Sequence, residues 1–540
     1  MSEPNPGAHS AQSIAAERAA LSPFAPLRSP VFRMLWGIWV TANLCTWMHD
    51  VAAAWMMTSF TSTPLWVALV QTASTVPMFL LGLPSGALAD ILDRRRYFIV
   101  TQFWVAGVAL VLCAVTVADA MTAPLLLALT FANGVGLAMR WPVFSAIVPE
   151  LVPRAQLPAA LGLNGIAMNA SRIAGPLVAG GLIASAGTEY VFVLNAVLSV
   201  ISGFVIMSWR RKHAPSPLGR ERLISAMRVG LQFVGQSARL RAVLLRVFMF
   251  FFHSTALLAL LPLVARGLHA GGAGVFTTLL ASMGLGAITS VLLLPRLRRI
   301  IGGERLLMRG TIVQAVAMLG VAYAPHLLIA APAMFIAGMV WIATVNSLSV
   351  SAQLALPDWV RARGMSIYQM GIMGASAAGA ALWGQIATWS SVPTAITLAA
   401  FSGVIAIRIS QWLVVNKAED EDLTPSRELK APTPKFPPGQ GHVVMTIEYR
   451  IDPDRAAEFL ELMRESRRSR LRQGAINWEL LRDVSDPGRF TERVVDESWT
   501  EHLRRFDRLT AADTALRRRK LKFHIAESPP VIHRRIVELP

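Results

Sequence analysis

Three ionisable side chains lie inside long apolar stretches of this sequence: Asp50, Arg140 and Arg172. Charged groups within a membrane-spanning segment are costly, so they usually belong to an ion or proton pathway. A carboxyl group in an apolar cavity can exchange a proton near neutral pH. We therefore expect Asp50 to couple a transport reaction to proton movement. The alternative is that Asp50 is a structural partner of Arg140 or of another polar side chain.

Residues that support enzymatic chemistry are sparse. Trp499 and His502 could mark a small-molecule pocket near the C-terminus, although a histidine with no acid–base partner in its motif is more often structural. The two cysteines, Cys45 and Cys113, each lie in an apolar stretch, which predicts neither a disulfide framework nor a zinc site. With no metal cluster, nucleotide loop or nucleophile triad in the sequence, we expect no catalytic residue, metal or cofactor.

Twelve apolar segments must position the three charges, and each is long enough to cross a bilayer core of about 30 Å. We expect an all-α polytopic membrane protein with two six-helix halves, at residues 31–209 and 242–415, and a basic loop at 210–241 between them. The predicted helices lie near residues 31–59, 64–90, 97–118, 122–147, 159–184, 189–209, 242–266, 271–295, 305–323, 326–354, 364–388 and 391–415.

Composition divides the chain in two. Of its 540 residues, 54% are hydrophobic and 16% charged, whereas soluble domains carry about 25% charged residues. Eleven of the 33 acids lie in residues 1–415 and twenty-two in residues 416–540, so only the second part has a soluble composition. The net charge of +18 does not indicate nucleic-acid binding, because the basic excess lies in short loops of the membrane part.

The basic residues also predict orientation. Loops after every second predicted helix carry Lys and Arg, whereas the intervening loops carry a single one, Arg266. Basic loops stay on the cytoplasmic side, so both termini are expected in the cytoplasm and the protein in the plasma (inner) membrane. Residues 1–30 contain no signal peptide and are expected to be disordered.

One short loop between two predicted helices has a specific pattern of glycine, aspartate and arginine. It resembles the loop between helices 2 and 3 of the major facilitator superfamily, and the resemblance implies a charge network that gates the cytoplasmic face. The alternative is a chance basic loop that only marks topology. The residues are Gly86, Asp90, Asp93, Arg94, Arg95 and Arg96.

The two halves repeat. A Pro-acid-x-Val pattern follows the fourth predicted helix and recurs 208 residues later after the tenth. Parallel six-helix repeats are the architecture of major facilitator transporters, which bind substrate near the midplane between the halves. We expect pseudo-symmetric charge networks at the two loops, built from Glu150, Arg154, Asp358, Arg361 and Arg363.

Residues 31–415 resemble, nearly end to end, the bacterial subfamily of enterobactin exporters and macrolide efflux proteins. The matching text includes Asn43 to Trp55 and Pro357 to Gly364. The resemblance implies a proton-coupled antiporter that exports an amphiphilic small molecule, such as a siderophore or drug, with Asp50 and Arg140 facing the cavity. A glycine–proline motif in the fifth helix resembles that of antiporters, although tight packing also explains it: Gly175, Pro176, Gly180 and Gly181. The alternative is a proton-coupled importer of a metabolite.

The C-terminal part is expected to be a proline-rich linker, 416–440, followed by a cytoplasmic domain, 441–540. The order β-α-β-β-α-β predicts a ferredoxin-like α+β fold. The pattern from Glu497 to His502 resembles antibiotic-biosynthesis monooxygenases, whose dimeric barrels close only as pairs. The resemblance implies a homodimer through this domain; a domain that modifies the transported molecule is the alternative.

Overall fold

The computed structural model describes most of the chain, including nearly all of the predicted helices and strands. The predicted disordered segment 1–30 and the predicted linker 416–440 fall largely on positions outside the described residues, but Ala25–Arg28 forms a 3-10 helix, η1, where disorder was expected. The residues that the structure does not describe are 1–21, 23, 154–155, 210–222, 269–271, 302, 358, 415–421, 427, 429–431, 433–440 and 539–540.

Twelve long helices occupy the twelve predicted positions, which confirms the polytopic helical fold. Among the described residues, nine helices are long and apolar enough to cross a membrane. The twelve helices are α2 (Pro30–Phe60), α3 (Pro64–Ile91), α4 (Arg94–Val117), α5 (Ala123–Leu151), α6 (Leu157–Ser185), α7 (Thr188–Ser208), α9 (Ala238–Gly267), α10 (Ala273–Ile301), α11 (Gly303–Ala322), α12 (Leu327–Leu354), α13 (Arg361–Trp389) and α14 (Val392–Val414).

Local sequence explains where several of these helices begin. Pro30 and Pro64 stand at the first position of α2 and α3, where the missing N–H costs nothing and the fixed φ suits a helix. Ser29 and Asp93 are N-caps: their side chains accept hydrogen bonds from the backbone N–H groups of Phe32 and Arg96. These prolines and polar caps therefore mark where the apolar helices begin.

The stretch predicted as a basic loop, 210–241, contains a further helix, α8 (Leu223–Gln236). Only Ser237 separates it from α9, which begins before its predicted start. The prediction failed here because basic residues interrupt the stretch, whereas its apolar residues repeat at helical spacing. Val229 and Phe233 lie on that apolar face and are buried.

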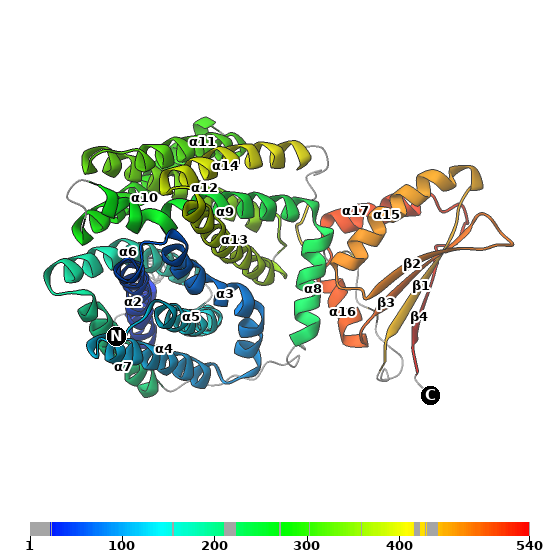
Figure 1. Ribbon diagram of the computed structural model, residues 1–540. Helices are drawn as coiled ribbons and strands as arrows, with labels where there is room; N and C mark the ends of the chain where they lie inside the picture. Colours follow the sequence, from blue (N-terminus) through cyan, green and yellow to red (C-terminus); the bar gives the residue numbers. More distant parts are fainter. Residues whose placement is uncertain are drawn as a thin grey trace, which may run out of the picture. The chain divides into compact units, whose positions relative to one another are not determined.

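Chain contacts divide the protein into two compact units. The second unit comprises residues 221–245, 348–368 and 410–540, and the first comprises the remainder. Within the first unit, α3 packs along α5, α4 along α7 and α2 along α6. Figure 1 shows the helices of the first half in blue and cyan and those of the second half in green and yellow.

The pairs α3–α13 and α6–α10 are among the helix contacts that join the halves. The Thr72 hydroxyl of α3 donates to the Ala377 carbonyl of α13 at 3.0 Å, and α6 packs against α10. One continuous apolar core lies at the end of the bundle where α2 is followed by α3. It contains residues of both halves, among them Met57 of the first and Trp383 of the second. Near the opposite ends, a separate cluster that includes Phe98 and Phe144 belongs to the first half alone. The halves therefore share their core at the α2–α3 end.

The C-terminal domain is a four-stranded antiparallel sheet with helices on one face (Figure 1). The strand order β2-β3-β1-β4 and the element order confirm the ferredoxin-like α+β fold. Side chains alternate along β3, and the inward ones, such as Phe490 and Val494, are buried against α15. The elements are β1 (Val443–Arg450), α15 (Ala456–Arg472), β2 (Asn477–Arg482), β3 (Arg489–Asp496), α16 (Trp499–Asp507), α17 (Ala511–Leu521) and β4 (Val531–Ile536), with a short 3-10 turn at Pro453–Arg455.

Candidate functional site

Asp50 lies half-buried in α2, and its carboxylate is held from the neighbouring helix. The Ser74 hydroxyl of α3 donates to Asp50 Oδ1 at 2.9 Å. A hydrogen bond to a carboxylate in a site of low dielectric is stronger than one in water. The structure thus places the Asp50 carboxylate at the contact between α2 and α3.

Arg140 reaches the same helix one turn away. Its Nη2 donates to the Ala42 carbonyl at 3.3 Å and to the Thr46 hydroxyl at 3.4 Å. Thr46 lies four residues, about one turn, before Asp50 on α2. Arg140 therefore bonds to α2 one turn away from Asp50, and the two charged groups have different partners. Arg172 is elsewhere: its guanidinium donates to Asn169 Oδ1 at 3.1 Å, within its own helix.

Sequence reasoning missed Ser74 and Thr46, the partners of the two charges. A short polar run in α3, from Gln71 to Thr75, was the available signal. Hydroxyl side chains are common in membrane helices because they can bond to their own backbone, as Thr75 does to the Gln71 carbonyl. The run therefore carries little information until a facing charge is known.

The glycine–proline motif of α6 faces two different helices. A Cβ on Gly175 would overlap Trp47 of α2, and a Cβ on Gly180 would overlap Thr277 of α10. Gly181, by contrast, has no atom within 4 Å of its Cβ position. Two of the three glycines thus permit close helix approach, one of them across the contact between the halves.

The described hydrogen bonds of the loop from Gly86 to Arg96 involve the start of α4 and the end of α7. Asp93 accepts from the Arg96 N–H at 2.8 Å as the N-cap, and Arg95 donates to the Met207 carbonyl of α7 at 2.6 Å. Gly86 lies in an ordinary contact with Pro142. The side-chain surroundings of Asp90 lie outside the described residues, as do those of Glu150.

The two pseudo-symmetric loops are described only in part. Arg154 and Asp358 lie outside the described residues. Arg361 is exposed at the start of α13, and Arg363, two residues further on, packs beside Gly230 of α8. These positions place the second loop next to α8, an arrangement that the repeat alone did not predict.

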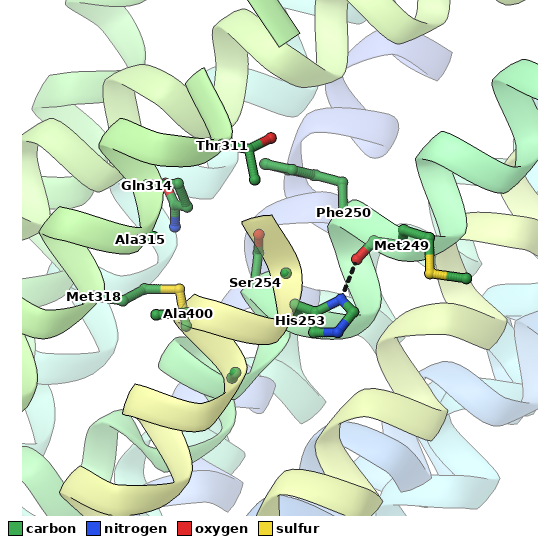
Figure 2. Close-up of a pocket in the computed structure, with 11 residues that line it drawn as sticks. Met249, Phe250, His253, Ser254, Thr311, Gln314, Ala315, Met318 and Ala400 are labelled. Atoms are coloured by element: carbon green, nitrogen blue, oxygen red, sulfur yellow. Dashed lines mark hydrogen bonds between the residues drawn. The ribbon is translucent and has the colours of Figure 1, made fainter. Parts of the chain in front are cut away.

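A small polar cavity lies among α9, α11 and α14 (Figure 2). It measures about 10 Å³, enough for one water molecule. His253 Nδ1 donates to the Met249 carbonyl at 2.6 Å, so the neutral ring leaves Nε2 as an acceptor. Gln314 is 1% exposed, and neither its amide oxygen nor its amide nitrogen has a hydrogen-bond partner among the described residues.

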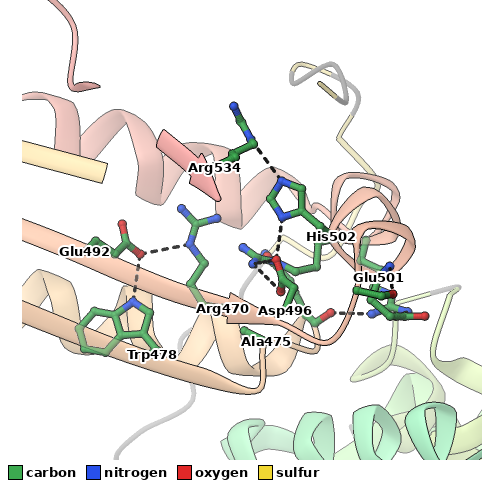
Figure 3. A network of polar contacts seen from close by, with 12 residues as sticks. Arg470, Ala475, Trp478, Glu492, Asp496, Glu501, His502 and Arg534 are labelled. Carbon is green, nitrogen blue, oxygen red and sulfur yellow. Dashed lines mark hydrogen bonds and ion pairs between the residues drawn. The ribbon is translucent and has the colours of Figure 1, made fainter. Parts of the chain in front are cut away.

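Charged side chains are buried together between the sheet and the helices of the C-terminal domain (Figure 3). His502 Nδ1 donates to Asp496 Oδ2 at 2.7 Å, and Arg534 donates to His502 Nε2 at 3.2 Å. Arg505 donates to both oxygens of Asp496 at 2.8 Å. Both ring nitrogens of His502 are therefore occupied, and Trp499 lies beside the ring with centroids 5.3 Å apart.

A second carboxylate, Glu492, is fully buried at the centre of β3. Lys520 Nζ lies 3.1 Å from it, and Arg470 Nε donates to it at 3.1 Å. Burial alone would raise the pKa of Glu492, but Lys520 and Arg470, with the indole N–H of Trp478, hold it well below its usual range. Burial lowers the pKa of Lys520 to about 8, against the opposing effect of Glu492. The two cations thus keep the buried Glu492 carboxylate ionised.

Comparison with protein families gives a match over nearly the whole chain. The model of the transmembrane secretion effectors matches residues 21–539, which include the C-terminal domain. The staphyloferrin A transporter of Staphylococcus aureus is 22% identical over 61% of this chain and 82% of its own length. Macrolide efflux protein A of Streptococcus pyogenes is 24% identical over 43% of this chain, which spans 58% of that relative.

Solved structures of transporters share the helical fold. A mutant of the nucleoside transporter NupG superposes with a TM-score of 0.59 at 12% identity, over 71% of this chain and 99% of its own. A bacterial homologue of the human lysosomal transporter Spinster, inward-facing and occupied, superposes with a TM-score of 0.56 at 15% identity, over 72% and 96%. At such identities the likeness concerns the fold alone.

Proposed function

This chain belongs to the transmembrane secretion effectors of the major facilitator superfamily, and we propose that it is a proton-coupled antiporter that exports an amphiphilic small molecule. The membrane location is the plasma (inner) membrane, with the basic loops and both termini in the cytoplasm. The observation that carries the coupling is Asp50, a membrane carboxylate bonded to Ser74 across a helix contact.

The relatives support the proposed substrate class. They are named for staphyloferrin A and for macrolides, which are small molecules. The α6 motif of Gly175 and Pro176 also favours export, as in the antiporters that it resembles. Import of a metabolite is the competing function, and it predicts proton movement in the direction of uptake.

The test uses everted membrane vesicles with an acidic lumen and a pH-sensitive dye. Candidate siderophores and macrolides should release protons from vesicles that contain the wild-type protein but not from those with Asp50→Asn. Glu189→Gln is the matched control, since Glu189 lies at the start of α7 beside the Gly187 turn. Release that survives in Asp50→Asn would reject Asp50 as the coupling group. Uptake by whole cells without any release would favour the importer.

The C-terminal domain has a non-catalytic role in this proposal. His502 and Glu492 are engaged in hydrogen bonds and ion pairs with neighbouring side chains, so they are poorly placed to act on a substrate. We also propose that two copies of the chain form a homodimer through the face of the sheet that the helices do not cover. Light scattering of the purified full chain tests the dimer, and a monomeric mass would reject it.

A further inference from the structure

One surface of the C-terminal domain binds two segments that lie far away in the sequence. The first is α8, which belongs to the same compact unit. Arg228 of α8 forms an ion pair of 2.5 Å with Glu497, which follows β3. Gln232, one turn further along, donates to the Ala475 carbonyl at 3.4 Å. The domain therefore recognises one face of α8 through a charge and a backbone group.

The apolar part of this contact is built around Gly474, which ends α15. Its φ of +108° is strained for any other residue, and a Cβ there would lie 3.0 Å from the Val229 side chain. Val229 is fully buried, although α8 lies in the connection between the two six-helix halves, where an exposed helix would be expected. The apolar face of α8 is thus covered by the domain.

The second segment is the turn around Trp359, between α12 and α13. The Arg508 guanidinium lies 5.2 Å from the centre of the Trp359 ring, a cation–π contact. Arg508 is itself held, since it donates to the Gln473 carbonyl at 2.8 Å and to Glu501 at 2.9 Å. Trp359 also meets Phe233 of α8 edge-on at 5.8 Å. The domain, α8 and the Trp359 turn therefore meet at one point.

The described part of the linker after α14 is itself hydrogen-bonded to the C-terminal domain. Ser426 N–H donates to the Leu509 carbonyl at 2.9 Å, and Ala511 N–H donates to the Thr424 carbonyl at 2.9 Å. These bonds hold the described part of the linker along the start of α17. The domain is thus attached at α8, at Trp359 and at its own linker.

Two of these attachments adjoin long helices. α8 is followed by Ser237 and then α9, and Trp359 lies two residues before α13. The two helices contact each other where the Trp383 indole of α13 donates to the Phe252 carbonyl of α9 at 2.8 Å. α13 also packs on α3 across the contact between the halves, where the Leu65 N–H of α3 donates to the Thr388 hydroxyl of α13 at 3.1 Å.

We propose that the C-terminal domain is a clamp that binds α8 and the Trp359 turn together and thereby stabilises the conformation closed at the α2–α3 end. A domain that binds one conformation better shifts the equilibrium towards it by its differential affinity, and the coupling is reciprocal. The inference rests on the proposed function for its orientation, in which the α2–α3 end is the outer end. Releasing the clamp then favours opening to the outside.

The test reports opening at the outer end. Ala387→Cys, at a buried position of the core that the halves share, is introduced into the full chain with Cys45 and Cys113 changed to alanine, and cells are treated with a membrane-impermeant maleimide. Arg228→Glu and Trp359→Leu should each raise the labelling rate about two- to fivefold, the shift expected from losing one half-buried contact. The charge swap Arg228→Glu with Glu497→Arg should restore the parent rate.

The control is Glu465→Arg, which breaks an exposed ion pair with Arg519 in the same domain and should leave labelling unchanged. Equal rates in the clamp variants and the control would overturn the proposal. Labelling needs neither substrate nor a proton gradient, so this result is independent of the transport assay.

Discussion

Gly180 of α6 faces the Thr277 side chain of α10 so closely that a Cβ on the glycine would overlap it. This contact joins the two six-helix halves, and the adjacent core contains apolar residues from both. The absence of a side chain at Gly180 lets α6 approach the β-branched side chain of Thr277 on α10 closely. A transport cycle that opens this end must separate them.

Gly180→Ala tests this contact, and Gly181→Ala is its control. The first variant forces the helices apart and should destabilise the protein by about 1–3 kcal/mol, the usual cost of overpacking. Gly181 has open space at its Cβ position, so its variant should unfold at the wild-type temperature. Thermal unfolding in detergent measures both. Equal midpoints would mean that α6 and α10 do not meet at Gly180.

Ser74→Ala should weaken proton-coupled transport without abolishing it. The variant removes the hydrogen bond to Asp50, and bonds to charged groups contribute about 1.5–3 kcal/mol. We expect the dye assay to show a loss of about tenfold or more, smaller than that of Asp50→Asn. Thr75→Ala is the matched control, because Thr75 bonds only within its own helix among the contacts described. A fully active Ser74→Ala would show that Asp50 does not depend on this partner.

Gln314→Leu should leave the thermal midpoint unchanged or raise it. The buried amide has no hydrogen-bond partner, and burying such a group costs about 1–3 kcal/mol on protein mutational scales. Gln314→Ala should lower the midpoint instead, because it enlarges the cavity beside His253. If the leucine variant is strongly destabilised, the amide must be bound through a water in the cavity.

Asp93→Ala should fray the start of α4. It removes the N-cap that accepts from Arg96 N–H, a loss of about 0.5–2 kcal/mol. Hydrogen exchange of the first-turn amides should speed up, and Asp93→Ser should restore most of the protection because serine also caps. Equal protection in all three proteins would show that the loop is held by other contacts.

Glu492→Gln should destabilise the C-terminal domain by about 3–5 kcal/mol at pH 7, because Lys520 and Arg470 are left buried without their carboxylate. The pKa of Glu492 is lowered in the folded state, so its contribution is complete above the ordinary glutamate pKa and is lost as pH falls through the folded value. Between pH 5 and 7 the difference from wild type should be constant; below that range it should shrink. Chemical unfolding followed by tryptophan fluorescence measures it.

Hydropathy and charge alone determined the positions of the twelve membrane helices and the ferredoxin-like order of the C-terminal domain. A membrane-spanning helix requires a long apolar segment, and a sheet with one covered face requires alternating apolar and polar residues. Both elements can therefore be recognised from the length and periodicity of apolar residues in the sequence. The positions of Asp50, Arg140 and the α6 glycines are visible for the same reason.

Only the tertiary structure decided which groups those residues meet. Ser74 and Thr46 became partners of Asp50 and Arg140 because α3 and α5 pack against α2, and nothing in the local sequence encodes that choice. The helix α8 was missed because basic residues interrupt its stretch, and its apolar face meets Gly474 and Trp359, which lie more than a hundred residues away. Local patterns record what each segment needs to bury, whereas long-range packing decides what buries it.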